Sequence, residues 1–183
     1  SQELFGNENP VKLEYCSGNG AWIIDRAQEN PDINWIALEK KFDRVQKIWS
    51  KKQNRKLDNL FIVYGDGRTW AEDYVHENSV DEVFVNFPDP WPKDRHAKHR
   101  IIQSPFILEV QRQLKNEGLI TLVTDDETYA GQMMQVMEES DGFILDYQGD
   151  NLEYGGSYFE KLWREMGRTI RHMRFRKSAE IKK

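Results

Sequence analysis

The sequence predicts one α/β domain in which helices cover both faces of a mostly parallel sheet. Short apolar runs alternate along the chain with longer amphipathic segments, as strands alternate with crossover helices. A Ser-Gly-Asn-Gly turn at residues 17–20 follows the first apolar run, at the point where such folds pass from strand to helix. The 183 residues suffice for one core, so we expect residues 1–183 to form a single domain.

The expected elements follow one another with short connections. Strands are predicted at residues 11–16, 33–38, 60–64, 80–87, 119–124, 143–146 and 169–175. Helices are predicted from residue 21 to about 30, and at 41–54, 104–115 and 126–140. Asn30-Pro31-Asp32 should stop the first helix. Ser104 should cap the third helix with Pro105 in its first turn, and Gly118 should mark its end.

Acidic residues and glycines fall at the carboxyl ends of the first four predicted strands, where a doubly wound sheet binds its ligand. These residues are Glu14, Gly18, Gly20, Glu39, Asp66 and Asp89. Glycines let the backbone approach a ligand closely. A carboxylate after the second strand, about 19 residues beyond the turn, can accept hydrogen bonds from both hydroxyls of a ribose. The pattern therefore predicts a nucleotide cofactor at this edge of the sheet.

Two cofactors compete for this site. In a dinucleotide fingerprint the third glycine would fall at Ile23, where a bulky side chain should separate helix from strand and hinder pyrophosphate binding. S-adenosylmethionine has no pyrophosphate, and its positive sulfonium and amino group suit neighbouring acids such as Glu14 and Asp66. The pattern favours S-adenosylmethionine over NAD. The alternative is an ordinary strand-to-helix turn whose neighbouring acidic residues are solvated.

The stretch from Asn86 to Arg100 reads N-F-P-D-P-W-P-K-D-R-H-A-K-H-R and is the most informative in the chain. Three prolines are expected to hold it extended and stiff, with Asp89 between Phe87 and Trp91. The rings could stack on a base while the carboxylate accepts hydrogen bonds from guanine N1-H and the exocyclic amine, leaving N7 free. The alternative is a rigid loop whose aromatic side chains pack on the core.

Positive charge is concentrated in two segments, although the chain has a net charge of −5. Residues 161–183 contain nine Lys/Arg against two acidic residues, and residues 91–100 contain four against one. A basic face on an acidic body is typical of a surface that binds a phosphate backbone, although basic runs also serve solubility alone. We expect phosphate contacts from Lys93, Arg95 and Arg100.

Composition argues against several other classes of protein. A single cysteine, Cys16, rules out an internal disulfide, and no apolar stretch approaches the roughly 20 residues of a membrane-spanning helix. No signal peptide is visible, so we expect a cytoplasmic protein with no membrane partner. We also expect a monomer or homodimer. His96 and His99 lack further ligands at suitable spacing, so no metal site is predicted.

Residues 86–100 resemble the F-P-D-P-W-x-K-x-R-H-x-K-R signature of the tRNA (guanine-N7-)-methyltransferase family in its bacterial, TrmB-like form. The resemblance covers nearly the whole chain, from Glu14 to Phe175. It implies the Rossmann-like fold of class I S-adenosylmethionine-dependent methyltransferases, with a mostly parallel seven-stranded sheet. It also implies methyl transfer to N7 of guanine 46 in the variable loop of tRNA.

The same resemblance implies roles for individual residues. Positions that bind S-adenosylmethionine match Glu14, Glu39, Asp66 and Asp89, and Asp89 also matches the catalytic residue. Positions that bind tRNA match Lys93, Asp125, Ser157, Tyr158, Phe159 and Glu160. The family usually has threonine at position 157 and glycine at position 16. It also carries an N-terminal segment that this sequence, which opens at Ser1, is expected to lack.

Two other functions stay open at this point. Asn86-Phe87-Pro88-Asp89 is weakly similar to the N-P-P-Y type loop of amino-group methyltransferases, which would act on another RNA, although Phe87 disturbs the spacing. A noncatalytic RNA-binding subunit could keep the same fold, but retention of every cofactor acid argues against it.

Overall fold

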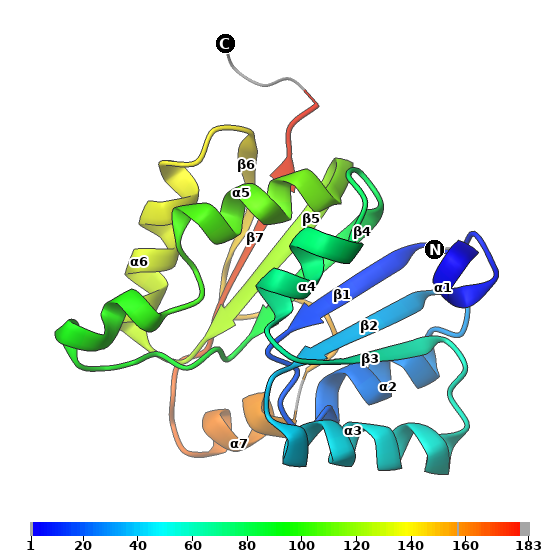
Figure 1. Ribbon diagram of the computed structural model, residues 1–183. Helices are drawn as coiled ribbons and strands as arrows, with labels where there is room; N and C mark the ends of the chain where they lie inside the picture. Colours follow the sequence, from blue (N-terminus) through cyan, green and yellow to red (C-terminus); the bar gives the residue numbers. More distant parts are fainter. Residues whose placement is uncertain (1, 157, 180–183) are drawn as a thin grey trace.

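A computed structural model describes residues 2–156 and 158–179, which contain a seven-stranded sheet (Figure 1). Its strands are β1 (Val11–Tyr15), β2 (Asn34–Glu39), β3 (Leu60–Tyr64), β4 (Val80–Asn86), β5 (Leu114–Thr124), β6 (Phe143–Gly149) and β7 (Arg171–Lys177). Their order in the sheet is β3-β2-β1-β4-β5-β7-β6. Neighbours from β3 to β5 pair in parallel, whereas β7 pairs antiparallel with β5 and β6. The predicted mostly parallel, seven-stranded sheet is confirmed.

The strand order reverses at β1, which lies between β2 and β4. Connections on the two sides of such a reversal leave in opposite directions and open a crevice at the carboxyl ends of the strands. The residues that follow β1, β2, β3 and β4 are therefore brought to one edge of the sheet, although they are far apart in the chain.

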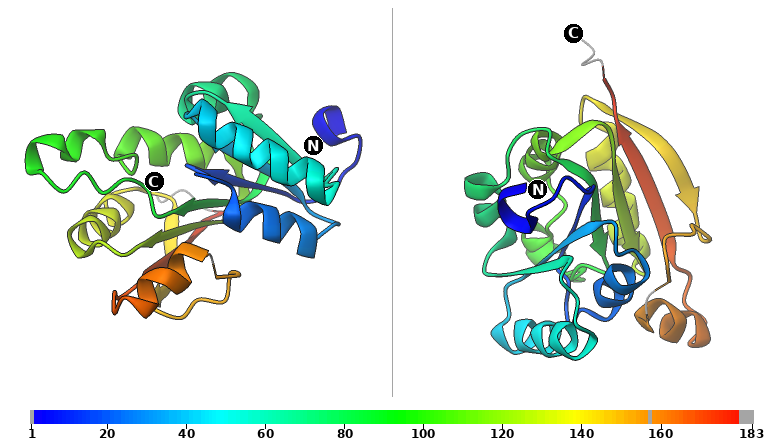
Figure 2. Two further views of the ribbon diagram at one scale, coloured as in Figure 1. Left: turned by 90° about the horizontal axis from the view of Figure 1, so that it is seen from below. Right: turned by 90° about the vertical axis from the view of Figure 1, so that its right-hand side faces the viewer.

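Two helices cover one face of the sheet and three cover the other (Figures 1 and 2). The pair consists of α2 (Ala21–Glu29) and α3 (Phe42–Arg55), and the other three are α4 (Gly67–Tyr74), α5 (Ser104–Gln113) and α6 (Glu127–Glu138). Under the pair, Ile48 of α3 is buried with Trp22 and Phe84. Under the three, the rings of Tyr15 and Phe106 meet edge to face, with centroids 4.9 Å apart.

Four short helices of the described residues lie outside the helices that the sequence predicts. They are α1 (Gln2–Phe5), α4, the 3₁₀ helix η1 (Asp94–His99) and α7 (Tyr158–Glu165). The sequence contains one signal for α4, the N-cap residue Asp66. Its side chain accepts hydrogen bonds from the backbone N–H groups of Arg68 and Thr69. Both figures place α7 at the same end of the molecule as α3.

The boundary between α5 and β5 was predicted wrongly. Gln103 precedes α5 and Ser104 is its first residue, with no side-chain cap, although Pro105 lies in the first turn as expected. The helix ends at Gln113 and β5 begins at once, so Gly118 lies within the strand. A Cβ atom at Gly118 would lie 2.9 Å from a backbone carbonyl oxygen, so close backbone approach explains this glycine.

Candidate active site

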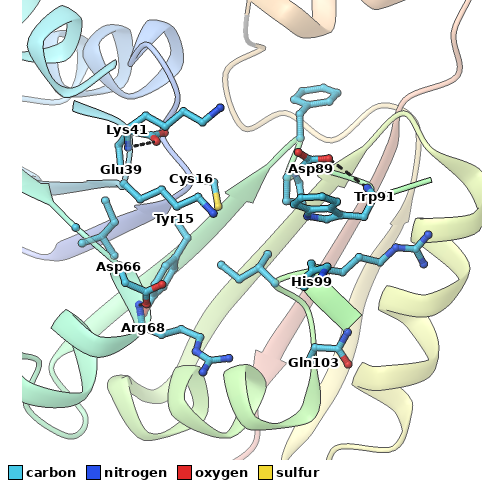
Figure 3. A pocket seen from close by; sticks show the side chains of 18 of the residues that line it. Tyr15, Cys16, Glu39, Lys41, Asp66, Arg68, Asp89, Trp91, His99 and Gln103 are labelled. Atoms are coloured by element: carbon cyan, nitrogen blue, oxygen red, sulfur yellow. Dashed lines mark hydrogen bonds between the residues drawn. The ribbon is translucent and has the colours of Figure 1, made fainter. Parts of the chain in front are cut away.

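A cavity of about 790 Å³ opens at the carboxyl ends of β1 to β4 (Figure 3). Figure 3 shows Cys16, Glu39 and Asp66 on one side of this cavity and Asp89 and Trp91 on the other. The predicted residues Glu14, Gly18 and Gly20 are not in its wall and instead support it through their contacts. The cavity lies at the edge of the sheet where the sequence predicts a nucleotide cofactor.

The turn after β1 has a backbone conformation that favours glycine. Cys16, Gly18 and Gly20 have φ angles of +59°, +58° and +73°. A Cβ atom at Gly20 would lie only 2.7 Å from Cγ1 of Ile48, whose side chain is fully buried. Gly20 is therefore required by both conformation and packing, and glycine at position 16, as is usual in the resembled family, would also suit its φ.

Gly20→Ala is expected to lower the free energy of unfolding by at least about 1–2 kcal/mol, the usual cost of a left-handed conformation in a residue with a side chain. The clash with Ile48 adds to this cost. Gly131→Ala is the matched control, because a Cβ there meets no atom within 4 Å and alanine favours the interior of α6. If denaturant unfolding gave the same free energy of unfolding for Gly20→Ala and Gly131→Ala, glycine would not be required at position 20.

Glu39, the last residue of β2, joins two loops at the cavity wall. Its side chain is buried, and it accepts hydrogen bonds from the backbone N–H of Gly18 at 2.8 Å and of Lys41 at 2.9 Å. Each carboxylate oxygen has two lone pairs, so both oxygens can still accept a hydrogen bond from a hydroxyl group. The position therefore suits the ribose contact expected from the sequence.

Glu39→Ala is expected to weaken S-adenosylmethionine binding by about 1–3 kcal/mol, because hydrogen bonds to a charged group contribute this much. The loss includes the ribose contact and the ordering of the Gly18 turn. Isothermal titration calorimetry measures it directly. Unchanged affinity would remove Glu39 from the cofactor site.

Asp66 follows β3 and is exposed at the cavity. Its Oδ1 accepts hydrogen bonds from the backbone N–H of Arg68 at 3.0 Å and of Thr69 at 3.2 Å. Its Oδ2 makes no hydrogen bond with the residues that the structure describes. One oxygen is thus committed to capping α4, and the other can accept a hydrogen bond from a ligand.

Glu14 is a buried carboxylate with one unpaired oxygen. Its side chain is 2% exposed, and Oε1 accepts a hydrogen bond from Nδ2 of Asn86 at 2.8 Å. Within the described part of the chain, Oε2 has no partner. Burial raises the pKa of Glu14 to about 7, against the opposing effect of the hydrogen bond from Asn86. A buried acceptor without a donor lowers the stability of the folded state, and a cationic amino group would supply the missing donor. This oxygen therefore fits S-adenosylmethionine.

The loop around Asp89 is sharply bent and not extended, contrary to the prediction from its prolines. Phe87 and Trp91 have φ angles of +48° and +44°, a conformation that costs roughly 1–3 kcal/mol for such residues. Oδ1 of Asp89 accepts a hydrogen bond from the backbone N–H of Trp91 at 3.2 Å (Figure 3). The Trp91 ring lies against His99, with centroids 5.2 Å apart. The two bends direct Asp89 toward the cavity between two aromatic residues that also line it.

Arg100 supports this loop instead of serving as an exposed phosphate contact, so that prediction was wrong. Its side chain is 6% exposed, and Nε donates a hydrogen bond to the carbonyl oxygen of Pro90 at 2.7 Å. The guanidinium also lies 4.9 Å from the centre of the Tyr129 ring. Lys93 and Arg95, in contrast, are exposed as expected.

Over residues 161–179 the C-terminal basic segment is largely neutralised by carboxylates, so this described part does not form the basic face that the charge count predicts. Among residues 161–179, five of the seven Lys/Arg side chains are in ion pairs. The pairs are Arg164 with Glu160, Arg168 with Asp125, Arg171 with Glu127, Arg174 with Asp146 and Arg176 with Glu117.

Glu160 lies in a buried polar cluster. It is 8% exposed and accepts hydrogen bonds from the Tyr154 hydroxyl at 3.0 Å and from Arg164 at 2.8 Å. Burial by itself would raise the pKa of Glu160, but His172, Arg164 and Tyr154 together lower it to about 2. Glu160 is therefore ionised and held in place. Among the other predicted tRNA-binding positions, Ser157 and the side chains of Tyr158 and Phe159 lie outside the described residues.

Comparisons with known proteins identify the family of this chain. A family model described as "Putative methyltransferase" matches residues 8–173. The tRNA (guanine-N(7)-)-methyltransferase of Chlamydia felis is 47% identical over 176 residues, which cover 95% of this chain and 79% of that protein. The enzyme of the same name from Chlamydia muridarum is 49% identical over 175 residues, covering 92% and 77%. The chain belongs to the tRNA (guanine-N7-)-methyltransferase family.

Solved structures agree with the fold of this member of the tRNA (guanine-N7-)-methyltransferase family. The 16S rRNA methyltransferase KamB superposes with a TM-score of 0.70 at 14% identity, over 97% of this chain and 92% of that one. The aminoglycoside resistance methyltransferase NpmB1 gives 0.66 at 18% identity, over 96% and 91%. At such identities the similarity concerns the fold alone, and it confirms the predicted Rossmann-like, class I methyltransferase architecture.

Three residues that support the site in this family member carried no sequence signal. Nε1 of Trp22 donates a hydrogen bond to the carbonyl oxygen of Gly155. The Tyr154 ring lies 5.6 Å from that of Trp22 and 5.2 Å from that of His172, between centroids. These contacts hold the segment before α7 in place. The sequence does not reveal them, because the three residues lie far apart along the chain.

Within residues 2–156 and 158–179, no group of three or more His, Cys, Asp or Glu side chains is placed to hold a metal ion. None of the helices in this described part is both long enough and apolar enough to span a bilayer. Cys16 is exposed.

Proposed function

We propose that the chain is an enzyme that methylates N7 of a guanine in tRNA, at position 46 of the variable loop, with S-adenosylmethionine as the methyl donor. The observation that carries this proposal is the unpaired, buried oxygen of Glu14, whose chain neighbours Tyr15 and Cys16 line a cavity that also presents Asp89 between two aromatic residues. The names of the related enzymes support the same base and substrate.

The cofactor is proposed to bind to residues at the ends of the first three strands. Glu14 would accept hydrogen bonds from its amino group, Glu39 from its ribose and Asp66 from its base, with Gly18 and Gly20 shaping the turn. When bound, S-adenosylmethionine supplies a methyl group on a positively charged sulfur. The carboxylates of this chain would balance that charge and hold the group in one orientation.

Asp89 is the proposed catalytic residue. Guanine N7 has a lone pair and no proton, so it needs alignment and no strong general base. The Asp89 carboxylate would accept hydrogen bonds from N1-H and the exocyclic amine, while Phe87 and Trp91 would flank the base. Fixed alignment of the reacting groups can supply roughly 7–11 kcal/mol. The bent loop supports this role because it fixes where the carboxylate points.

The remaining substrate contacts are proposed at residues outside the cavity wall. Exposed Lys93 suits a phosphate. Asp125 and Glu160 are paired with arginines, so they would orient the segments around them, including Ser157, Tyr158 and Phe159, and need not each touch tRNA. The single domain, the monomer or homodimer and the cytoplasmic location stay predictions.

The test is to incubate the protein with S-adenosylmethionine and an unmodified tRNA transcript and to identify the methylated nucleoside by mass spectrometry. We expect 7-methylguanosine, and none when guanine 46 of the transcript is replaced by adenine. Methylation of an exocyclic amine would favour the amino-group alternative. Cofactor binding without any methylated product would favour a noncatalytic RNA-binding subunit.

A further inference from the structure

Helix α3 carries positive charge that the fold leaves largely unpaired. Residues 40–56 contain eight Lys/Arg against one acidic residue. Among the described residues, only Arg44 and Arg55 of these eight have a carboxylate within 4 Å, and the distance from Arg44 to Glu39 is 3.8 Å. The C-terminal segment is equally basic in sequence, but most of its charges are paired. Besides exposed Lys93 and Arg95, α3 therefore carries unpaired positive charge, in a segment that the charge counts do not single out.

Four of these side chains form a row on one side of α3. Arg44, Lys47, Lys51 and Arg55 are spaced by three or four residues and so share a side of the helix. Lys51 donates a hydrogen bond to the carbonyl oxygen of Asn19 at 2.9 Å, and Arg55 pairs with Asp25 of α2. The row, called the α3 basic row below, thus follows the side of α3 that faces α2, its neighbour in Figure 1.

The α3 basic row starts at the cavity. Lys40, Lys41 and Arg44 line the cavity, and Figure 3 shows Lys41 next to Glu39. Lys47 is exposed roughly 5 Å further along the helix axis, outside the cavity wall. Basic side chains therefore continue from the cavity wall onto the outer surface. A polyanion whose reacting group enters the cavity would pass over this surface.

We propose that the α3 basic row, chiefly Arg44 and Lys47, binds the phosphate backbone of tRNA next to the guanine that is methylated. This inference rests on the proposed function. An arginine can hold a phosphate through two parallel hydrogen bonds, and an exposed lysine acts as a point charge near it. Lys51 and Arg55 contact α2 and its preceding turn, so they fix the direction of the row relative to the cofactor site.

The experiment compares two double variants of the same helix with the same loss of charge. Arg44→Gln/Lys47→Gln removes the two side chains of the row that are proposed to bind phosphate, and Lys52→Gln/Lys56→Gln removes two charges that lie off the row. Binding of an unmodified tRNA transcript is measured by fluorescence anisotropy over a range of salt concentrations. For the first variant we expect the slope of log K against log[salt] to shrink by about 1.4–1.8, from two lost phosphate contacts, and for the control almost no change.

A slope that is unchanged in the row variant would overturn the proposal, and so would equal changes in both variants, which would indicate a general effect of net charge. The single variant Lys47→Gln should reduce the slope by about 0.7–0.9, and no reduction would also count against the row. The test is separate from that of the proposed function. Wild-type protein that binds the transcript with a salt slope carried by the row but forms no 7-methylguanosine would overturn only the proposed function.

Discussion

Asp89→Asn is expected to lower the rate of methyl transfer at saturating tRNA and cofactor by about 10²–10³-fold, the loss seen when one preorganised polar contact is removed from an active site. The amide would place an N–H donor against the N1-H or amine of guanine, both of which are donors. The variant keeps Oδ1, so it can keep the hydrogen bond to the backbone N–H of Trp91. The bent loop should therefore survive the substitution.

Two measurements separate this role from others. The free energy of unfolding should match that of wild type, because Asp89 is exposed and asparagine has the same shape. Asp58→Asn, which changes an exposed aspartate in another loop, is the control and should leave the rate unchanged. A normal rate in Asp89→Asn would refute the catalytic role. Loss of cofactor binding with intact tRNA binding would assign Asp89 to the cofactor instead.

The strands and long helices were predictable because their signals are local. Buried apolar runs such as those around Leu13, Ile36 and Val83 are strand-like by themselves. The short helix α4 is not predicted because its Gly-Asp-Gly start resembles a loop, and the capping role of Asp66 is evident only in the structure. The bends at Phe87 and Trp91 were also missed, since prolines predict extended backbone unless tertiary contacts override them.

The surroundings of the site depend on contacts that no local pattern contains. Glu14 is paired with Asn86, 72 residues away, and that contact leaves its other oxygen unpaired. Charge counts along the chain indicated a basic C-terminal face, but pairing across strands, as between Arg174 and Asp146, cancels much of it. Sequence reading could therefore place acids at the correct edge of the sheet but could not tell which charges stay unpaired.

Glu14→Gln is expected to stabilise the cofactor-free protein at pH 8 while weakening cofactor binding. Glu14 has a pKa of about 7 when folded, above the ordinary value of 4.5 for a glutamate, so the folded state holds its proton more tightly than the unfolded chain. Its contribution to stability is complete below pH 4.5 and is lost as the pH rises through 7. The loss amounts to about 3 kcal/mol. Glutamine has no such proton, and its oxygen can still accept from Asn86.

Denaturant unfolding of both proteins between pH 4 and 8 measures the difference in their free energies of unfolding. The difference should develop between about pH 4.5 and 7.5, and a difference that does not change with pH would contradict the raised pKa.

Cofactor binding tests the role of the unpaired oxygen. A positive amino group favours ionised Glu14, so wild-type binding at pH 6.5 should release protons, which calorimetry in buffers of different ionisation enthalpy detects. Glu14→Gln should release fewer protons and bind about 10–100-fold more weakly, because a hydrogen-bonded charge contributes about 1.5–3 kcal/mol. Equal affinity and equal proton release would show that the cofactor does not meet Glu14, and the buried oxygen would then need another partner.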